Sequence, residues 1–403
     1  MPVNQPELSP PLAVTGFKVG TASCGVKSPE LKGKRQDVTL IVSDVDCHAA
    51  GVFTSNRFRA ACVTLGEATI AANASGIRAI VANSGNANAG TGEMERAWSE
   101  SLIESGAIAA AVESTTVLSC STGVIGTPFP IERIQAGMHE ASASLSADNW
   151  AAAADAIRTT DTFAKWASAK VDDYTITGIC KGSGMIHPNM ATMLAFIATD
   201  APLTSEQLQP MLKRAADRSF NSISVDGDTS TNDTLYLLSS GIGLGAKPLT
   251  DIDLFERALT DLCIDLAQLI VRDGEGVSKF VTIEITGAAS EGDARTVGRS
   301  IAVSPLVKTA FAGSDANWGR ILSAVGNSGI AIDTNLISLS ADDVLMLERG
   351  NLHPDYRDEN GMAVFARDEF TITVDLGLGE ASATVWTGDL THEYITINAE
   401  YRT

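Results

Sequence analysis

The sequence has little positive charge and few aromatic side chains. Of its 403 residues, 29 are Lys or Arg and 49 are Asp or Glu, which gives a formal net charge of −20. A field of this sign repels nucleic acid and anionic lipid surfaces and favours solubility. Aromatic residues make up 5% of the chain and are not interleaved with basic ones, so a stacking platform for single strands is excluded. We expect no nucleic-acid partner and no membrane partner.

Motifs for disulfides, metals and membrane spans are also missing. The six cysteines occur singly, without Cys-x-x-Cys, which favours reduced thiols. The five histidines never fall at metal-ligand spacing with one another, so we predict no metal ion and no cofactor. No apolar stretch reaches about 18 residues without a charge or turn former. The first residues show no targeting pattern, and we expect a cytoplasmic protein.

The periodicity predicts strands in both halves of the chain, separated by helices. A hydrophobic content of 44% over this length allows a large core and suggests two domains or two similar halves. Strands are predicted at residues 37–43, 51–56, 77–82, 116–120, 193–199, 370–376, 383–386 and 394–398. Helices are predicted at residues 93–113, after Pro130, and at residues 149–157, 204–218 and 252–272. Sheets covered by helices are therefore expected.

Two predicted strands run into loops of small and polar residues. These loops are residues 83–92 and 121–126, and each precedes a predicted helix. A strand followed by a small polar loop and a helix is an arrangement that commonly binds anions or backbone groups. Cys120 lies next to the second loop, where we expect a buried structural thiol rather than a nucleophile.

The centre of the chain, residues 181–200, joins a polar loop to an apolar run. Thr192 stands at the junction, but its hydroxyl is a weak nucleophile and no triad partner is evident. If the hydroxyl attacks the carbonyl of Ala191 and the ester hydrolyses, the freed α-amine becomes a base with a pKa of about 7.7–8.0. The alternative is an ordinary threonine at the start of a strand.

The motifs around this junction resemble those of a known family. KGSGM at residues 181–185 and MATML at residues 190–194 resemble the self-cleavage signature of the ornithine acetyltransferases of arginine biosynthesis, also called glutamate N-acetyltransferases. Further blocks follow in the family's order: NSGNAN (83–88), STGVIG (121–126), TTDT (159–162), VDGDTSTNDT (225–234), DGEG (273–276), VKTA (307–310), GSDANWGR (313–320) and INAEYRT (397–403). The resemblance therefore covers nearly the whole chain.

The resemblance implies a fold, a processing step and a reaction. The fold is an α+β four-layer αββα sandwich, similar to N-terminal-nucleophile hydrolases but differently connected. The precursor is cut between Ala191 and Thr192 into an α chain, residues 1–191, and a β chain, residues 192–403, which assemble as a heterotetramer of two α and two β chains. Thr192 then moves an acetyl group from N-acetylornithine to glutamate through an acetyl-threonine ester.

The resemblance also implies the roles of individual residues. Thr122 and Gly123 form the oxyanion hole that assists Thr192. The substrate-binding positions are Thr159, Thr160, Lys181, Thr192, Glu275, Asn398 and Thr403. Which of Thr159 and Thr160 contacts the substrate is left open. Lys181 is suited to a carboxylate and Glu275 to an ammonium group, whereas the alternatives are a solvated loop charge and an acid at a helix end.

Other functions are kept as alternatives. One is a self-processing aminopeptidase or amidohydrolase of related fold, in which water accepts the acyl group. Another is a binding protein in which Thr192 is only structural. The family occurs with and without acetyl-CoA as a further donor, and the sequence leaves this choice open. It also departs from the family pattern at Gly90, where cysteine is common, and at residues 277–279, where Ala-Thr-Lys is common.

Overall fold

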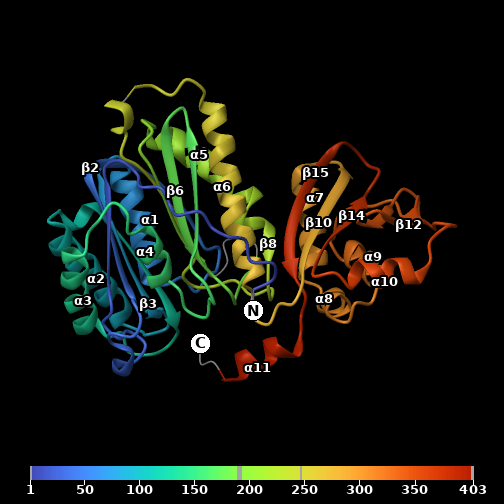
Figure 1. Ribbon diagram of the computed structural model, residues 1–403, viewed down its shortest axis with the longest axis horizontal. Helices are drawn as coiled ribbons and strands as arrows, with labels where there is room; N and C mark the ends of the chain where they lie inside the picture. The colour runs from blue at the N-terminus through green and yellow to red at the C-terminus, as the bar shows by residue number, and fades with distance from the viewer. Residues whose placement is uncertain (1, 188–192, 246, 401–403) are drawn as a thin grey trace.

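The computed structural model describes residues 2–187, 193–245 and 247–400, and contains two β-sheets (Figure 1). The first sheet has eight strands in the order β4-β3-β2-β9-β7-β6-β5, with β1 also paired to β2. The second has seven strands in the order β13-β12-β11-β14-β10-β15-β8. Figure 1 shows the first sheet in one lobe and the strands β10 to β15 of the second sheet in another, drawn in orange and red.

The strands of the first sheet are β1 (Phe17–Ala22), β2 (Val38–Phe53), β3 (Ile77–Asn86), β4 (Val117–Val124), β5 (Lys165–Val171), β6 (Tyr174–Lys181), β7 (Leu194–Thr199) and β9 (Thr234–Ser239). Those of the second are β8 (Ile223–Ser224), β10 (Phe280–Ala288), β11 (Ser338–Ala341), β12 (Val344–Glu348), β13 (Asn351–Leu352), β14 (Glu369–Asp375) and β15 (Ala381–Gly388). The helices are α1 (Ala61–Asn73), α2 (Met94–Ala110), α3 (Ile131–Ala143), α4 (Trp150–Ala156), α5 (Ser205–Arg218), α6 (Ile252–Arg272), α7 (Glu291–Ala302), α8 (Pro305–Ala312), α9 (Trp318–Gly326), α10 (Asp358–Phe365) and α11 (His392–Glu400).

The long strand β2 folds the first sheet onto itself. Its first half pairs with β1 and β3, and its second half, from His48, pairs with β9. The pairing with β3 shifts register between Val42 and Cys47, where the exposed Asp44 interrupts the buried pattern. Such an irregularity bends a strand and increases its twist. One strand therefore belongs to two packed arms, which joins them without a loop.

Alternating side chains show that the two arms lie face to face. Ile80 of β3, Phe196 of β7 and Tyr236 of β9 belong to one buried cluster between the arms. Their sequence neighbours point the other way, because successive side chains of a strand alternate between the two faces of the sheet. Val81 packs towards α2 and α3, and Ile197 packs towards α5 and α6. The layers are helix, sheet, sheet and helix, which confirms the predicted αββα fold for this part of the chain.

The second sheet was not foreseen as a separate layer. Its strands pack with α7 to α10 around their own apolar core, which contains Phe311, Phe365 and Phe370. Trp386 of β15 and Phe280 of β10 also join the core beneath α6, so the two lobes share buried surface. No helix in the described residues is long and apolar enough to cross a membrane.

Three local predictions are wrong. The two strands predicted at residues 37–43 and 51–56 are one strand, because β2 continues through its polar middle. The polar loops predicted from residues 83 and 121 begin inside β3 and β4, where Asn83 pairs with Ser121 and both are buried. The strand predicted at residues 394–398 is part of the helix α11.

Most long elements match the sequence prediction. The helix α6 runs over the predicted residues 252–272, and α2 and α4 lie within about three residues of their predicted ends. The helix α3 begins directly after Pro130, as predicted. The capping box at Thr204 is present, with Gln207 as its partner, and α5 continues to Arg218. The apolar run after Thr192 is the strand β7, and all six of its residues are buried.

The packing between the arms gives a stability prediction. Phe196 is 1% exposed and its ring centroid lies 6.3 Å from that of Tyr236. We expect Phe196→Ala to lower the free energy of unfolding by about 3–5 kcal/mol in urea denaturation, because a large cavity would open between the two arms of the first sheet. Phe58→Ala is the control, since Phe58 is 63% exposed, and it should change the value by less than about 0.5 kcal/mol. Equal effects of the two substitutions would contradict the packing.

Candidate active site

Seven of the sequence-predicted site residues line one cavity of about 200 Å³. They are Thr122, Gly123, Thr159, Thr160, Lys181, Glu275 and Asn398. They come from β4, from the segment before β5, from the end of β6, from the α6–β10 connection and from α11. Segments that are distant in sequence therefore meet at a single concave site, which is the usual form of a small-molecule pocket.

The remaining predicted positions, Ala191, Thr192 and Thr403, lie outside the described residues. The chain is described again from Met193, whose backbone N–H donates to Asp233 Oδ1 at 3.1 Å. The next residue, Leu194, pairs with Lys181 across β7 and β6. The described chain therefore resumes beside Lys181, one of the residues that line the cavity.

Lys181 is the last residue of β6 and is 2% exposed. Its Nζ donates to Thr122 Oγ1 at 3.3 Å, which joins the ends of β6 and β4. Burial lowers the pKa of Lys181, although the nearby carboxylates of Asp161 and Glu275 act in the opposite direction. The alternative of a solvated loop charge is therefore wrong. An anionic ligand at this position would offset the cost of burying the ammonium group.

Gly123 takes a backbone conformation that requires glycine. Its φ is +130°, and a Cβ at this position would lie 2.3 Å from the carbonyl carbon of Gly85. Gly85 and Gly123 pair across the parallel strands β3 and β4, so the two backbones approach closely at the cavity wall. The polar residue before it, Thr122, is 3% exposed. The local sequence of small residues is what allows the two strands to end together here.

A buried ion cluster fixes the segments around the cavity. Lys165, whose side chain is fully buried, donates to Asp161 at 2.7 Å and to Asp273 at 2.5 Å. Burial acts to raise the pKa of Asp161, but Lys165 and Lys181 outweigh it and hold the pKa well below its usual range. Burial also acts to lower the pKa of Lys165, but the two carboxylates outweigh it and the pKa is raised. Burial raises the pKa of Asp273, and Lys165 acts in the opposite direction. The three side chains are at most 1% exposed, so they lie together almost without contact with solvent.

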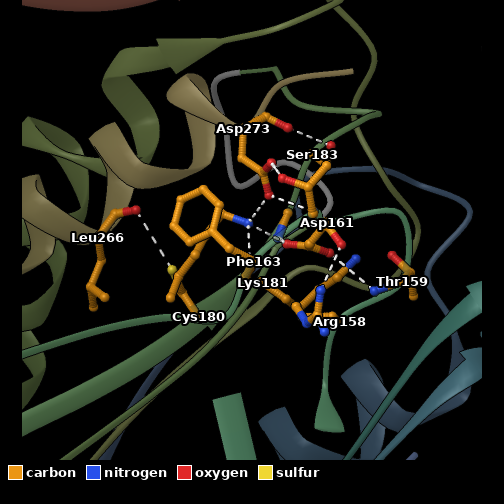
Figure 2. Close-up of polar contacts among 12 residues, drawn as sticks. Arg158, Thr159, Asp161, Phe163, Cys180, Lys181, Ser183, Leu266 and Asp273 are labelled. Carbon is orange, nitrogen blue, oxygen red and sulfur yellow. Dashed lines mark hydrogen bonds and ion pairs between the residues drawn. The ribbon is translucent and has the colours of Figure 1, made fainter. Parts of the chain in front are cut away.

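Asp161 and Asp273 also bind neighbouring groups of the site, Asp161 through its carboxylate and Asp273 through its backbone carbonyl (Figure 2). Asp161 accepts from the Gly182 N–H at 2.6 Å and from the Thr159 N–H at 3.0 Å. The backbone carbonyl of Asp273 accepts from Ser183 Oγ at 2.6 Å, and the Ser183 carbonyl accepts from the Glu275 N–H at 2.9 Å. The cluster therefore sets the positions of the loops that carry Thr159, Lys181 and Glu275.

The sequence analysis missed this cluster. Asp161 and Asp273 stand within the TTDT and DGEG blocks, but no spacing rule pairs two residues 112 positions apart. Lys165 lies outside every block. An aspartate followed four residues later by a lysine gives no signal that either side chain is buried. Only the tertiary structure brings Asp273 to this pair.

The carboxyl-terminal helix α11 forms part of the cavity wall. Asn398 Nδ2 donates to Glu275 Oε2 at 2.9 Å, and Tyr394, one turn earlier, also lines the cavity. Gly276 has φ +69°, and a Cβ there would lie 2.3 Å from the Tyr394 nitrogen, so only glycine lets the helix start approach the α6–β10 connection. Glu275 is 9% exposed and holds Asn398, so it does more than end a helix.

Two further acids line the cavity, Asp226 and Asp228, which follow β8. Asp226 accepts backbone N–H groups from Met185 at 2.6 Å, from Ile186 at 2.8 Å and from Asp228 at 3.2 Å. Burial nevertheless raises the pKa of Asp226 to about 6. The cavity thus contains one buried ammonium group and three carboxyl groups, which suits a ligand that carries charges of both signs.

Other chemistry has no support at this site. Within the described ranges, no group of three or more His, Cys, Asp or Glu side chains is placed to hold a metal ion. All six cysteines are buried and free. Burial raises the pKa of Cys120 well above its usual value, so this thiol is an inert part of the core and does not act as a nucleophile.

Comparison with known proteins identifies the family. The profile of the ArgJ family matches residues 18–403. The chain belongs to the ArgJ family. It is 44% identical over 400 residues to the "Arginine biosynthesis bifunctional protein ArgJ" of Pseudomonas syringae pv. tomato, with 97% of each chain covered. The protein of the same name from Pseudomonas fluorescens is 44% identical over 399 residues, again with 97% of each chain covered. This ArgJ family chain is an acetyltransferase of arginine biosynthesis.

Solved structures of the ArgJ family cover part of the chain. The crystal structure of arginine biosynthesis bifunctional protein ArgJ from Bacillus halodurans has 39% identity and a TM-score of 0.49, and covers 51% of this chain and 98% of that one. The ornithine acetyltransferase from Mycobacterium tuberculosis, described as complexed with ornithine, has 26% identity and a TM-score of 0.38, and covers 45% of this chain and 94% of that one.

The buried cluster gives the prediction of this section. Lys165→Met removes the charge and keeps most of the side-chain volume, so two buried carboxylates lose their partner. We expect the free energy of unfolding to fall by about 3–5 kcal/mol in urea denaturation. Lys170→Met, on the same strand but exposed, should stay within about 0.5 kcal/mol of the parent. If Lys165→Met were as stable as this control, the cluster would not hold the site together.

Proposed function

We propose that the chain cleaves itself between Ala191 and Thr192 and then moves the acetyl group of N2-acetyl-L-ornithine to L-glutamate through an acetyl-Thr192 ester. The products are L-ornithine and N-acetyl-L-glutamate. The observation that carries this proposal is the meeting of all seven described site residues around one cavity. The family resemblance implies these residues without reference to their positions in space, and chance does not bring together positions from five separate segments.

The cleavage step follows from the chemistry of a threonine hydroxyl. Thr192 Oγ attacks the carbonyl carbon of Ala191, the C–N bond breaks, and the acyl group moves to oxygen as an ester. Water hydrolyses the ester, which leaves a carboxylate on Ala191 and a free α-amine on Thr192. The amine, with a pKa of about 7.7–8.0, then serves as the base for the hydroxyl of the same residue.

Acetyl transfer repeats the same bond changes with a substrate. The hydroxyl attacks the acetyl carbon of acetylornithine and ornithine leaves, after which the α-amine of glutamate attacks the ester and regenerates the hydroxyl. We assign Thr122 and Gly123 to the oxyanion that forms in each step, where one donor contributes about 3–4 kcal/mol. Lys181 meets the α-carboxylate common to both substrates, and Glu275 and Asn398 meet a polar or cationic group. Thr159 or Thr160 and Thr403 add hydrogen bonds.

We further infer that acetyl-CoA is a second donor. Both curated relatives at 44% identity are named bifunctional, which supports a second activity for this chain. Acetyl-CoA can form the same acetyl-Thr192 ester, so no second catalytic group is needed. We also propose a heterotetramer of two α chains, residues 1–191, and two β chains, residues 192–403, that acts in the cytoplasm.

Hydrolysis is the rival outcome at the same site. In a self-processing aminopeptidase or amidohydrolase, water would take the acyl group from Thr192 in place of glutamate. Release of acetate from acetylornithine in the absence of glutamate, at the rate of ornithine formation in its presence, would favour this rival. A protein that only binds ligands would give neither product.

The first prediction of this proposal concerns cleavage. Thr192→Ala has no hydroxyl and should remain one chain of 42.1 kDa without activity. Thr192→Ser keeps a hydroxyl and should give two chains. Intact mass spectrometry after expression distinguishes these outcomes. If the parent protein is itself uncut and inactive, the nucleophile hypothesis fails.

The second prediction concerns kinetics. Because acetylornithine must leave its acetyl group on the enzyme before glutamate reacts, double-reciprocal plots against the two substrates should be parallel. Acetyl-CoA with glutamate should also give N-acetylglutamate. Intersecting lines would argue against the acetyl-threonine route. If acetyl-CoA and glutamate gave no N-acetylglutamate, acetyl-CoA would not be a donor.

A further inference from the structure

The turn at residues 226–228 carries an acid that the proposed roles leave unused. Asp228 lines the cavity and its side chain is exposed. Among the described residues, none of the hydrogen bonds given by the structure ends on its carboxylate. Its backbone N–H is bound to Asp226, and burial lowers the pKa of His187 overall, although the charge of Asp228 acts to raise it. The other two acids of the cavity are engaged, since Asp226 holds three backbone N–H groups and Glu275 holds Asn398.

The turn is fixed relative to the loop that follows Lys181. Asp226 accepts from the backbone of Met185 and Ile186, and the Val225 N–H donates to the Ile186 carbonyl at 2.8 Å. The backbone that carries Asp228 is therefore tied to the loop beyond the buried lysine. Because the backbone of the turn is held in this way, the position of the Asp228 Cα relative to the cavity is fixed, which favours selective binding.

The charges of the two proposed substrates differ at their far ends. Both have an α-carboxylate, which suits Lys181. N-acetylornithine ends in an ammonium group, whereas glutamate ends in a second carboxylate. A carboxylate in the cavity that accepts none of the hydrogen bonds given by the structure attracts the terminal ammonium group and repels the terminal carboxylate.

We propose that Asp228 binds the side-chain ammonium group of the acetyl donor and so determines the preference for donors with a terminal amine. This inference rests on the proposed function. Asp228 is a specificity residue that acts on substrate binding and takes no part in the bond changes at Thr192. Asp226 is a positioning residue for it, because it fixes the turn through backbone bonds.

The test compares two donors that differ only in the terminal amine. N-acetyl-L-ornithine and N-acetyl-L-norvaline share the same carbon chain, and N-acetylglutamate formation is measured with each at saturating glutamate. In the parent enzyme we expect kcat/KM to favour acetylornithine. Asp228→Asn should reduce this preference about two- to fivefold, mostly through a higher KM for acetylornithine, and should leave acetylnorvaline nearly unchanged.

A matched control removes an exposed acid elsewhere. Asp343 is exposed in the turn between β11 and β12 of the second lobe, and is not part of the cavity wall. Asp343→Asn lowers the net negative charge equally and should keep the parent's donor preference. The KM for glutamate should not rise in Asp228→Asn, since removal of a like charge cannot weaken the binding of a carboxylate.

Two results would overturn the inference while the proposed function stands. One is an unchanged donor preference in Asp228→Asn, and the other is an equal loss with both donors, which indicates a structural effect. A failure of the proposed function appears differently, as a parent enzyme that forms no N-acetylglutamate from acetylornithine. That result would overturn both.

Discussion

The buried ion cluster is the constraint on which the site depends. Lys165 lies between Asp161 and Asp273 without access to water, and removal of one partner would leave unpaired charge in the core. The carboxylate of Asp161 also holds backbone groups of the segments that carry Thr159 and Lys181. Elsewhere in the protein apolar packing fixes the positions of chain segments, whereas here charge pairing does so. Charge pairing is also more directional, because the carboxylate oxygens accept hydrogen bonds.

The fold explains why the cavity forms at this place. β2 joins two arms of one sheet and lets them pack face to face, so the ends of β4 and β6 come together, and Lys181 reaches Thr122. The second lobe contributes through the connection after α6 and through α11, which returns beneath both lobes in Figure 1. Parts of the chain on both sides of Thr192 therefore line the cavity. Two chains produced by cleavage would remain joined by the β6–β7 and β2–β9 pairings.

The charges of the cavity match amino-acid substrates. One buried ammonium group, Lys181, is opposed by several carboxyl groups, although the chain as a whole is strongly acidic. Burial lowers the pKa of Lys181 and raises that of Asp226, so both groups gain when a ligand of opposite charge replaces lost water. This arrangement supports the proposed zwitterionic substrates, and the proposed difference between donor and acceptor rests on the side chain of Asp228.

The sequence by itself determined most of the long helices and the family, and its resemblance to that family supplied the predicted site residues. Helical periodicity and caps are local, so α5 and α6 were predictable. Only the tertiary structure decided that residues 394–398 form a helix, because their alternating pattern favours a strand, whereas α11 brings Tyr394 and Asn398 to the same wall. It alone also decided the pairing of Lys165 with Asp273. Contacts between residues far apart in the sequence depend on how the sheets and lobes pack. No local sequence pattern encodes such contacts.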